Sequence, residues 1–155
     1  MSEKYIYIYN NLINYTRNKD LYKSLNREDI FSDRLTLFLL HFAFFLKNFK
    51  NGDKKILQEI YDCMFKQLEL SIREIGYGDA SINKKMKNYI NLFHTIINKL
   101  ENWDKLNSYE KNKIINSLLN IEKNDYLSVY FDKYSIELKN NTLNYYIKSV
   151  LKSKK

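Results

Sequence analysis

The 155-residue chain is 45% hydrophobic and 15% aromatic, has one cysteine and no proline, and carries a net charge of +8. This length suits one domain with an ordinary core, and the apolar content excludes an intrinsically disordered protein. The single Cys63 excludes an intrachain disulfide, and three glycines are too few for the many turns of an all-β fold. We therefore expect one all-α domain over residues 1–155, a helical bundle of about six to seven helices.

The basic charge has two interpretations. Lysine outnumbers arginine by 22 to 4, and abundant lysine, asparagine, isoleucine and tyrosine are typical of an A+T-rich coding sequence. The same charge also suits an anionic membrane surface or RNA. A basic helical RNA- or ribosome-binding protein is therefore one alternative function.

Hydrophobic periodicity predicts helices in the first third of the chain. Residues 4–18 read as an amphipathic helix, and residues 18–31 as a polar connector. Ser32 or Asp33 is expected to cap a second helix, which runs to about residue 50. Its apolar run, residues 35–46, is too short to cross a bilayer and is expected to lie in the core. Gly52 is expected to end this helix in a left-handed conformation.

Two apolar stripes then predict a central antiparallel hairpin. Asp53 is expected to cap the first arm, and a Gly76-Tyr77-Gly78-Asp79 turn separates it from the second. Asp79 or Ser81 is expected to cap the second arm. The stripe residues are Ile56, Ile60, Met64, Leu68, Ile72 and Ile75 in the first arm, and Ile82, Met86, Tyr89, Phe93, Ile96, Leu100 and Trp103 in the second.

The last third is expected to add further helices. Residues 103–107 read as a loop, Ser108 as the cap of a helix to about residue 122, and Asn124 or Asp125 as the start of another. Asn140-Asn141 ends that helix, residues 142–151 form a short one, and residues 152–155 are a basic tail.

No catalytic or metal-binding constellation is present in the sequence. Cys63, His41 and His94 are too few for a cysteine–histidine metal site, and no phosphate-binding glycine motif occurs. We expect no enzyme activity and no cofactor. His41, inside an apolar run, is expected to be a hydrogen-bonded core residue. A further alternative makes the chain a carrier of haem or a small hydrophobic ligand, with a pocket around His41 and His94.

The hairpin sequence YDCMFKQLELSIREIGYGDASINKKMK (residues 61–87) resembles the ubiquinol–cytochrome c chaperone family, whose members show a run like MFxDMDxxLREMGVGDLxVxKxxKxM. The matching residues are Met64, Phe65, Arg73, Glu74, Gly76, Gly78, Asp79, Lys84 and Lys87. Upstream, LYKSLNREDIFSDRLTLFLLH (residues 21–41) resembles the family's FYxxLGVPDTFDGRFxxLxLH. Here the matching residues are Leu21, Tyr22, Leu25, Asp29, Phe31, Arg34, Leu40 and His41.

The sequence also departs from these motifs. Asn26-Arg27 replaces a Gly-Val pair, and Ser32-Asp33 replaces Asp-Gly. Gln67 and Glu69 stand where the family has aspartates. The resemblance covers residues 10–105, so residues 1–105 are expected to form the family-like core and residues 106–155 a C-terminal helical extension.

The resemblance implies a non-enzymatic assembly chaperone of respiratory complex III that binds newly made cytochrome b in an apolar groove. It implies a functional surface around Arg34, Arg73, Gly76, Gly78, Asp79, Lys84 and Lys87. The ribosome, an anionic membrane surface and a small partner protein are further partners that it implies. We expect a cytoplasmic protein, peripheral at the inner face of a bacterial inner membrane, or a protein on the mitochondrial matrix side.

Overall fold

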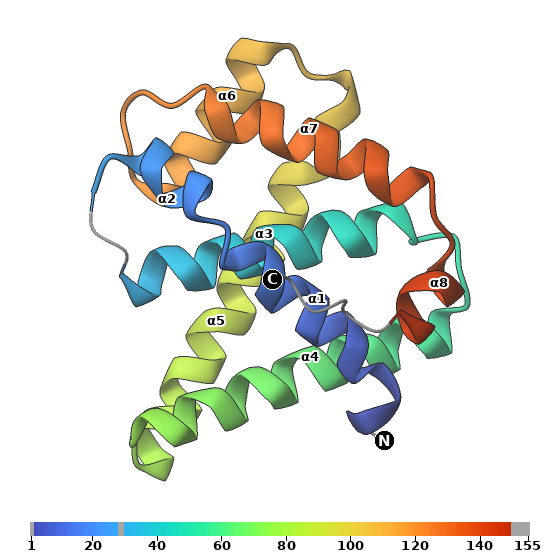
Figure 1. Ribbon diagram of the computed structural model, residues 1–155. Helices are drawn as coiled ribbons and strands as arrows, with labels where there is room; N and C mark the ends of the chain where they lie inside the picture. The colour runs from blue at the N-terminus through green and yellow to red at the C-terminus, as the bar shows by residue number, and fades with distance from the viewer. Residues whose placement is uncertain (1, 28–29, 150–155) are drawn as a thin grey trace.

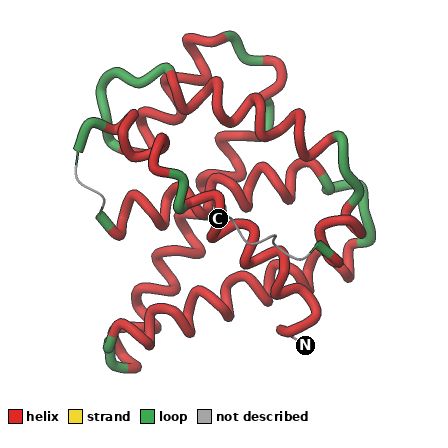
Figure 2. Tube along the Cα trace, in the orientation of Figure 1, coloured by secondary structure: helices red, strands yellow, loops and turns green. Residues whose placement is uncertain are grey.

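The computed structural model describes residues 2–27 and 30–149, and these form helices joined by short loops (Figures 1 and 2). The described segments contain eight α-helices, two short 3₁₀ helices and no strand, which confirms the predicted all-α class. The elements are η1 (Ser2–Tyr5), α1 (Ile6–Thr16), α2 (Lys19–Leu25), α3 (Phe31–Asn48), α4 (Lys54–Ile75), α5 (Asp79–Leu100), η2 (Trp103–Lys105), α6 (Ser108–Leu119), α7 (Tyr126–Lys139) and α8 (Leu143–Lys148).

Helix α3 lies at the centre of the molecule. Figure 1 shows it between the α4–α5 hairpin and the pair formed by α6 and α7, with α1 packed against it. Every side chain of residues 35–45 is buried. A helix covered on all sides has no need of a polar face, and this explains the continuous apolar run in the sequence.

The α4–α5 hairpin forms as predicted. The Asp53 side chain caps α4 by accepting hydrogen bonds from the amides of Lys55 and Ile56, at 2.8 and 3.3 Å. Phe65 on α4 meets Phe93 on α5 edge-to-face, with ring centroids 5.3 Å apart. Phe42 of α3 stacks on Phe93 at 5.0 Å. One aromatic cluster therefore joins α3 to both arms of the hairpin.

Three predictions about the start and end of α3 are wrong. The supposed connector contains α2, whose N-cap is Asn18. Ile30 is the N-cap of α3, and its hydrocarbon side chain has no acceptor for a cap bond. The predicted cap Asp33 lies inside the helix, where its carboxylate pairs with Arg27. Helix α3 ends at Asn48, and Gly52 does not adopt a positive φ.

The caps of two later helices also differ from expectation, and the start of a third agrees with it. Gly78 is the N-cap of α5, and neither Asp79 nor Ser81 caps it. Asn107, and not Ser108, is the N-cap of α6, where it forms a capping box with Glu110. Asn124 accepts hydrogen bonds from the first amides of α7, as predicted, at 3.0 and 3.1 Å.

The last third packs closely on α3. Phe131 of α7 stacks on Phe44 of α3 at 5.1 Å, and Trp103 meets Phe44 edge-on at 5.1 Å. Trp103 is fully buried, and its indole N–H donates to Asp132 at 2.8 Å. The C-terminal segment therefore completes the core around α3. Asp29 and the predicted tail, residues 152–155, lie outside the described residues.

Candidate functional site

The turn of the hairpin brings together four of the expected site residues: Arg73, Gly76, Gly78 and Asp79. Gly76 ends α4 with φ +109°, a left-handed angle that glycine adopts at little cost. Gly78 has an ordinary φ of −77°, so its conformation does not require glycine. A Cβ at either position would meet no atom within 4 Å, which shows that the turn is open to its surroundings.

An exposed ion-pair network ties the turn together. Arg73 donates through Nη1 to the Asp79 carboxylate, and through Nε and Nη2 to Glu69 at 3.4 and 3.3 Å. These two carboxylates raise the pKa of Arg73, with the Asp79 hydrogen bond as the main cause. The network orients Arg73 across the turn from α4 to the first residue of α5. Exposed ion pairs add little stability, so its effect is mainly to fix the geometry of this surface.

The remaining expected residues lie on two further parts of the surface. Lys84 and Lys87 are exposed on the outer side of α5, because Ile82 and Met86 occupy its buried side. Arg34 is exposed in the first turn of α3. In the same turn, the ring of Phe31 lies 6.4 Å from the ring of Tyr89 on α5. The structure thus clusters the turn residues but places Arg34 on a separate helix.

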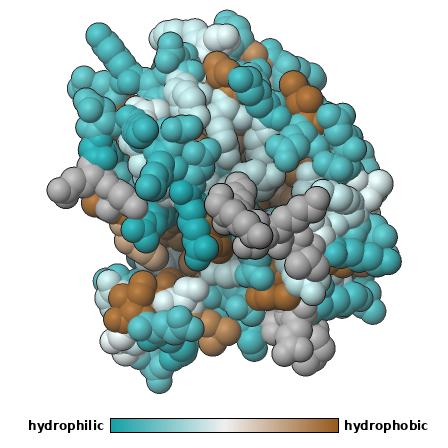
Figure 3. Space-filling view, viewed as in Figure 1, coloured by the Kyte–Doolittle hydropathy of each residue, from teal (hydrophilic) through white to brown (hydrophobic). Residues whose placement is uncertain are grey.

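Exposed apolar side chains at the turn escaped the sequence analysis. Ile75, predicted to lie in the core stripe, is 58% exposed because α4 extends beyond the body of the bundle. Tyr77 is 44% exposed, and Lys85 Nζ lies 4.5 Å from its ring centroid, a cation–π distance. Figure 3 shows apolar side chains gathered over this end of the hairpin. We call Arg73, Ile75, Tyr77, Asp79 and Lys85 the hairpin tip.

A shallow apolar groove lies toward the other end of α5. Ala43 and Leu46 of α3 and Ile97 and Leu100 of α5 line a hollow of about 390 Å³. Lys47 at its rim is paired with Asp104 at 3.0 Å. This is the described feature closest to the expected apolar groove, but it contains none of the motif residues.

His41 has the predicted role of a hydrogen-bonded core histidine. It is fully buried, and its Nδ1 lies 2.6 Å from the carbonyl oxygen of Leu37, which can only accept. Nδ1 therefore carries the proton, and Nε2 accepts from the hydroxyl of Tyr130 at 2.7 Å. Burial lowers the pKa of His41 to about 4, so the ring is neutral. Because both nitrogens are engaged, the haem-carrier alternative loses its main ligand.

His94 and Cys63 do not join His41 in a site. His94 is exposed on α5, where its Nε2 lies 3.3 Å from the hydroxyl of Tyr61. Cys63 is 4% exposed on α4, and burial raises the pKa of its thiol. Residues 2–27 and 30–149 contain no group of three histidine, cysteine or acidic side chains placed to hold a metal ion. Among these residues no helix combines the length and the apolar character that a membrane span needs.

Comparison with known proteins identifies the family. No curated protein and no solved structure gives a significant match to the chain. The model of the ubiquinol-cytochrome C chaperone family matches residues 23–103, from the middle of α2 to Trp103. The match covers more than half of the chain and includes α3 and the whole hairpin, so the protein belongs to the ubiquinol-cytochrome C chaperone family.

Proposed function

We propose that the protein assists assembly of respiratory complex III by binding newly made cytochrome b through the hairpin tip. Membership of the ubiquinol-cytochrome C chaperone family supports the assembly role, which is a role in protein binding and not in catalysis. The exposed apolar side chains of Ile75 and Tyr77 beside several charged groups support the choice of surface. The proposed docking residues are the hairpin tip with Arg34, Gly76, Gly78, Lys84 and Lys87.

The chemistry of the tip suits an unassembled membrane protein. Such a client exposes apolar segments and charged loops until its partner subunits cover them. Ile75 and Tyr77 can pack against the apolar part, since exposed apolar groups on a projecting element are typical of interaction sites. Arg73 is held in position by Glu69 and Asp79 and can offer its remaining guanidinium donors to a client carbonyl or carboxylate. The apolar groove near Leu46 lacks these motif residues, so we place the client at the tip.

The proposed client also implies where in the cell the protein acts. A client in a membrane requires the chaperone to work at the membrane surface, on the cytoplasmic side of a bacterial inner membrane or on the matrix side of a mitochondrial one. Lys85 in the hairpin tip, with Lys84 and Lys87 beside it, would favour an anionic lipid surface next to the client.

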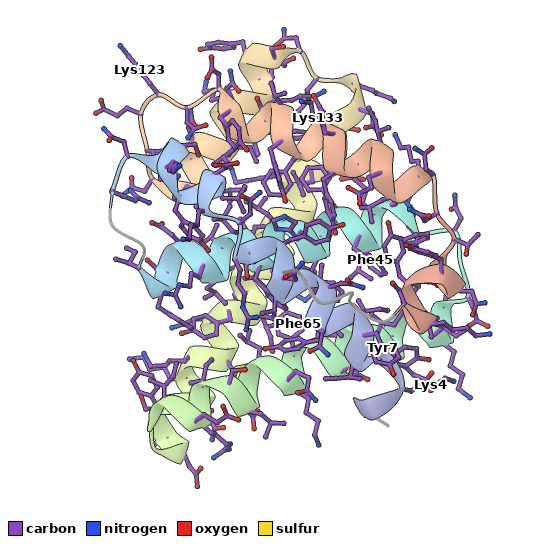
Figure 4. All side chains as sticks on the ribbon, in the orientation of Figure 1. Lys4, Tyr7, Phe45, Phe65, Lys123 and Lys133 are labelled. Carbon is purple, nitrogen blue, oxygen red and sulfur yellow. The ribbon has the colours of Figure 1, made fainter. Side chains whose placement is uncertain are left out.

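A charge-reversal experiment in cells lacking the gene tests the proposal. Cells carrying an Arg73→Glu/Lys84→Glu variant should accumulate far less assembled cytochrome b than cells carrying the unaltered gene. A matched Lys113→Glu/Lys123→Glu variant should behave like the unaltered protein. Both of these lysines are exposed, and Figure 4 shows Lys123 at the opposite end of the molecule from the hairpin turn.

Two further measurements make the result specific. Helical content should be the same in all variants, because each altered side chain is exposed. Co-precipitation of cytochrome b should fail with the tip variant and also with Ile75→Ser/Tyr77→Ser. Normal complex III assembly in cells carrying the tip variant would contradict the choice of surface, and normal assembly after deletion of the gene would contradict the function.

A further inference from the structure

A second recessed surface lies between the end of α1 and the outer part of α7. Its volume is about 610 Å³, within the range of about 300–1,000 Å³ that is usual for small-molecule sites. Asn14, Tyr15, Arg17 and Asn18 form one wall, and Tyr130, Lys133, Tyr134 and Glu137 form the other. Both walls lie outside residues 23–103, so the family match does not account for them. We call this hollow the tyrosine pocket.

The aromatic floor of the tyrosine pocket is held rigidly by the core. Tyr15 stacks on the buried His41 ring, with centroids 5.4 Å apart and planes at 13°. Tyr134 meets Tyr15 edge-on at 5.0 Å, and Tyr130 donates its hydroxyl to His41 Nε2. Burial raises the pKa of all three phenols, so they are neutral at physiological pH. A floor fixed in this way costs little conformational entropy when a planar ligand packs on it.

The rim of the tyrosine pocket carries two cations and one carboxylate, a net positive charge. Arg17 follows the last turn of α1, and Lys133 lies on α7, where it is labelled in Figure 4. Within the described parts of the chain neither side chain forms an ion pair, whereas Glu137 accepts the hydroxyl of Tyr15 at 3.0 Å. Asn14 and Asn18 add carboxamide groups. Two cations on facing walls can therefore bind one anionic group between them.

We propose that the tyrosine pocket binds a planar aromatic molecule that carries a phosphate or a carboxylate. The aromatic ring packs against the tyrosines, and the anionic group lies between Arg17 and Lys133. The carboxamides of Asn14 and Asn18 complete the hydrogen bonding of the anionic group or of polar atoms on the ring. This site is separate from the hairpin tip and does not depend on the client proposed there.

Flavin mononucleotide is a suitable probe, because riboflavin differs from it only by the phosphate. Flavin fluorescence titrated with the full-length protein should show flavin mononucleotide binding about a hundredfold more tightly than riboflavin, the effect of two charge-assisted contacts of about tenfold each. Arg17→Gln and Lys133→Gln should each weaken flavin mononucleotide binding about tenfold and leave riboflavin unchanged. Lys113→Gln, at an exposed position on α6, is the control and should change neither.

Three results would overturn the proposal. The first is that neither flavin binds up to about 1 mM, the weak end of ordinary ligand affinities. The second is equal affinity for the two flavins, and the third is that the Arg17 and Lys133 variants bind flavin mononucleotide as the unaltered protein does.

Competition then identifies the anionic group. Displacement of flavin mononucleotide by adenosine monophosphate indicates a phosphate ligand, and displacement by 1-naphthoate indicates a carboxylate.

Discussion

Arg27 and Asp33 form a bidentate ion pair, and Arg27 also links the segment before α3 to the end of α6. Arg27 donates from Nε and Nη2 to the two Asp33 oxygens at 2.9 and 2.6 Å, and from Nη2 to the carbonyl oxygen of Leu119 at 2.7 Å. Asp33 is 3% exposed. Both residues occur where the sequence departs from the motif it resembles, Arg27 in place of valine and Asp33 in place of glycine. The two departures from the motif therefore supply the two partners of one ion pair.

Removing one partner of this pair should destabilise the fold. Asp33→Asn should lower the free energy of unfolding by about 1–3 kcal/mol, because a buried acceptor of a charged donor is lost. Arg27→Gln should cost a similar amount, since it leaves the buried Asp33 carboxylate without its cation. The double variant should cost less than the sum of the two single changes, as urea unfolding of all four proteins would show.

Acid should destabilise the protein through His41. The pKa of the folded His41 is about 4, below the unfolded value of 6.5, so the unfolded state binds more protons between these pH values. The contribution of neutral His41 is complete above pH 6.5 and is lost as the pH falls toward 4, a loss of about 3 kcal/mol. Unfolding curves measured from pH 7 to pH 4 would show it as a decline in stability.

Carboxylates also titrate as the pH falls, and two variants separate the contribution of His41 from theirs. His41→Gln cannot titrate, so its stability should fall less steeply between pH 6.5 and 4 than that of the unaltered protein. His94→Gln removes an exposed histidine and should keep the original pH profile. Identical pH slopes for the two variants would show that His41 is not held neutral in the core.

The two glycines of the turn should respond in opposite directions to serine. Gly76→Ser forces a Cβ into φ +109° and should destabilise the protein by about 1–2 kcal/mol. Gly78→Ser keeps a suitable φ of −77° and adds an N-cap oxygen to α5, which should stabilise the protein by a few tenths of a kcal/mol. Thermal unfolding of both variants shows whether each change raises or lowers the stability. The same sign for both would contradict the geometry of the turn.

Residues 1–105 alone should not form the native core. Without α7, Phe44 loses its stacking partner Phe131, and His41 loses the Tyr130 hydroxyl. We expect the truncated protein to keep much of its helix, to lose cooperative unfolding and to bind a hydrophobic dye. Sharp, cooperative unfolding of the fragment would instead mark an independent domain.

The sequence predicted the elements whose signals are local and repeated. The two stripes of the hairpin and the apolar run of α3 each continue for several turns, and all appear as helices. Caps were harder to predict because several acceptors compete for the same amides. Asp33 was a reasonable cap by its position, but Arg27 binds it, and the Arg27 side chain is itself fixed by α6. Such a choice depends on contacts between distant parts of the chain.

The sequence predicts the turn of the candidate site, but it does not predict which side chains are exposed there. Gly76 and the Arg73 position follow from the motif and from the demands of a helix end. Ile75 fits the apolar period of α4 as well as Ile72 does, yet it is exposed because α4 extends past its neighbours. The tyrosine pocket gave no signal in sequence, since its walls are contributed by residues more than a hundred positions apart.

Trp103 gives the protein a built-in optical reporter. It is the only tryptophan, it is fully buried, and it lies where the family-matched region meets the C-terminal segment. Its ring touches Phe44 of α3, and its indole N–H is bound to Asp132 of α7. Separation of α7 from α3 would expose the indole to water and shift its emission to longer wavelength. Without any label, this emission can therefore show whether binding of a client opens the bundle or leaves it closed.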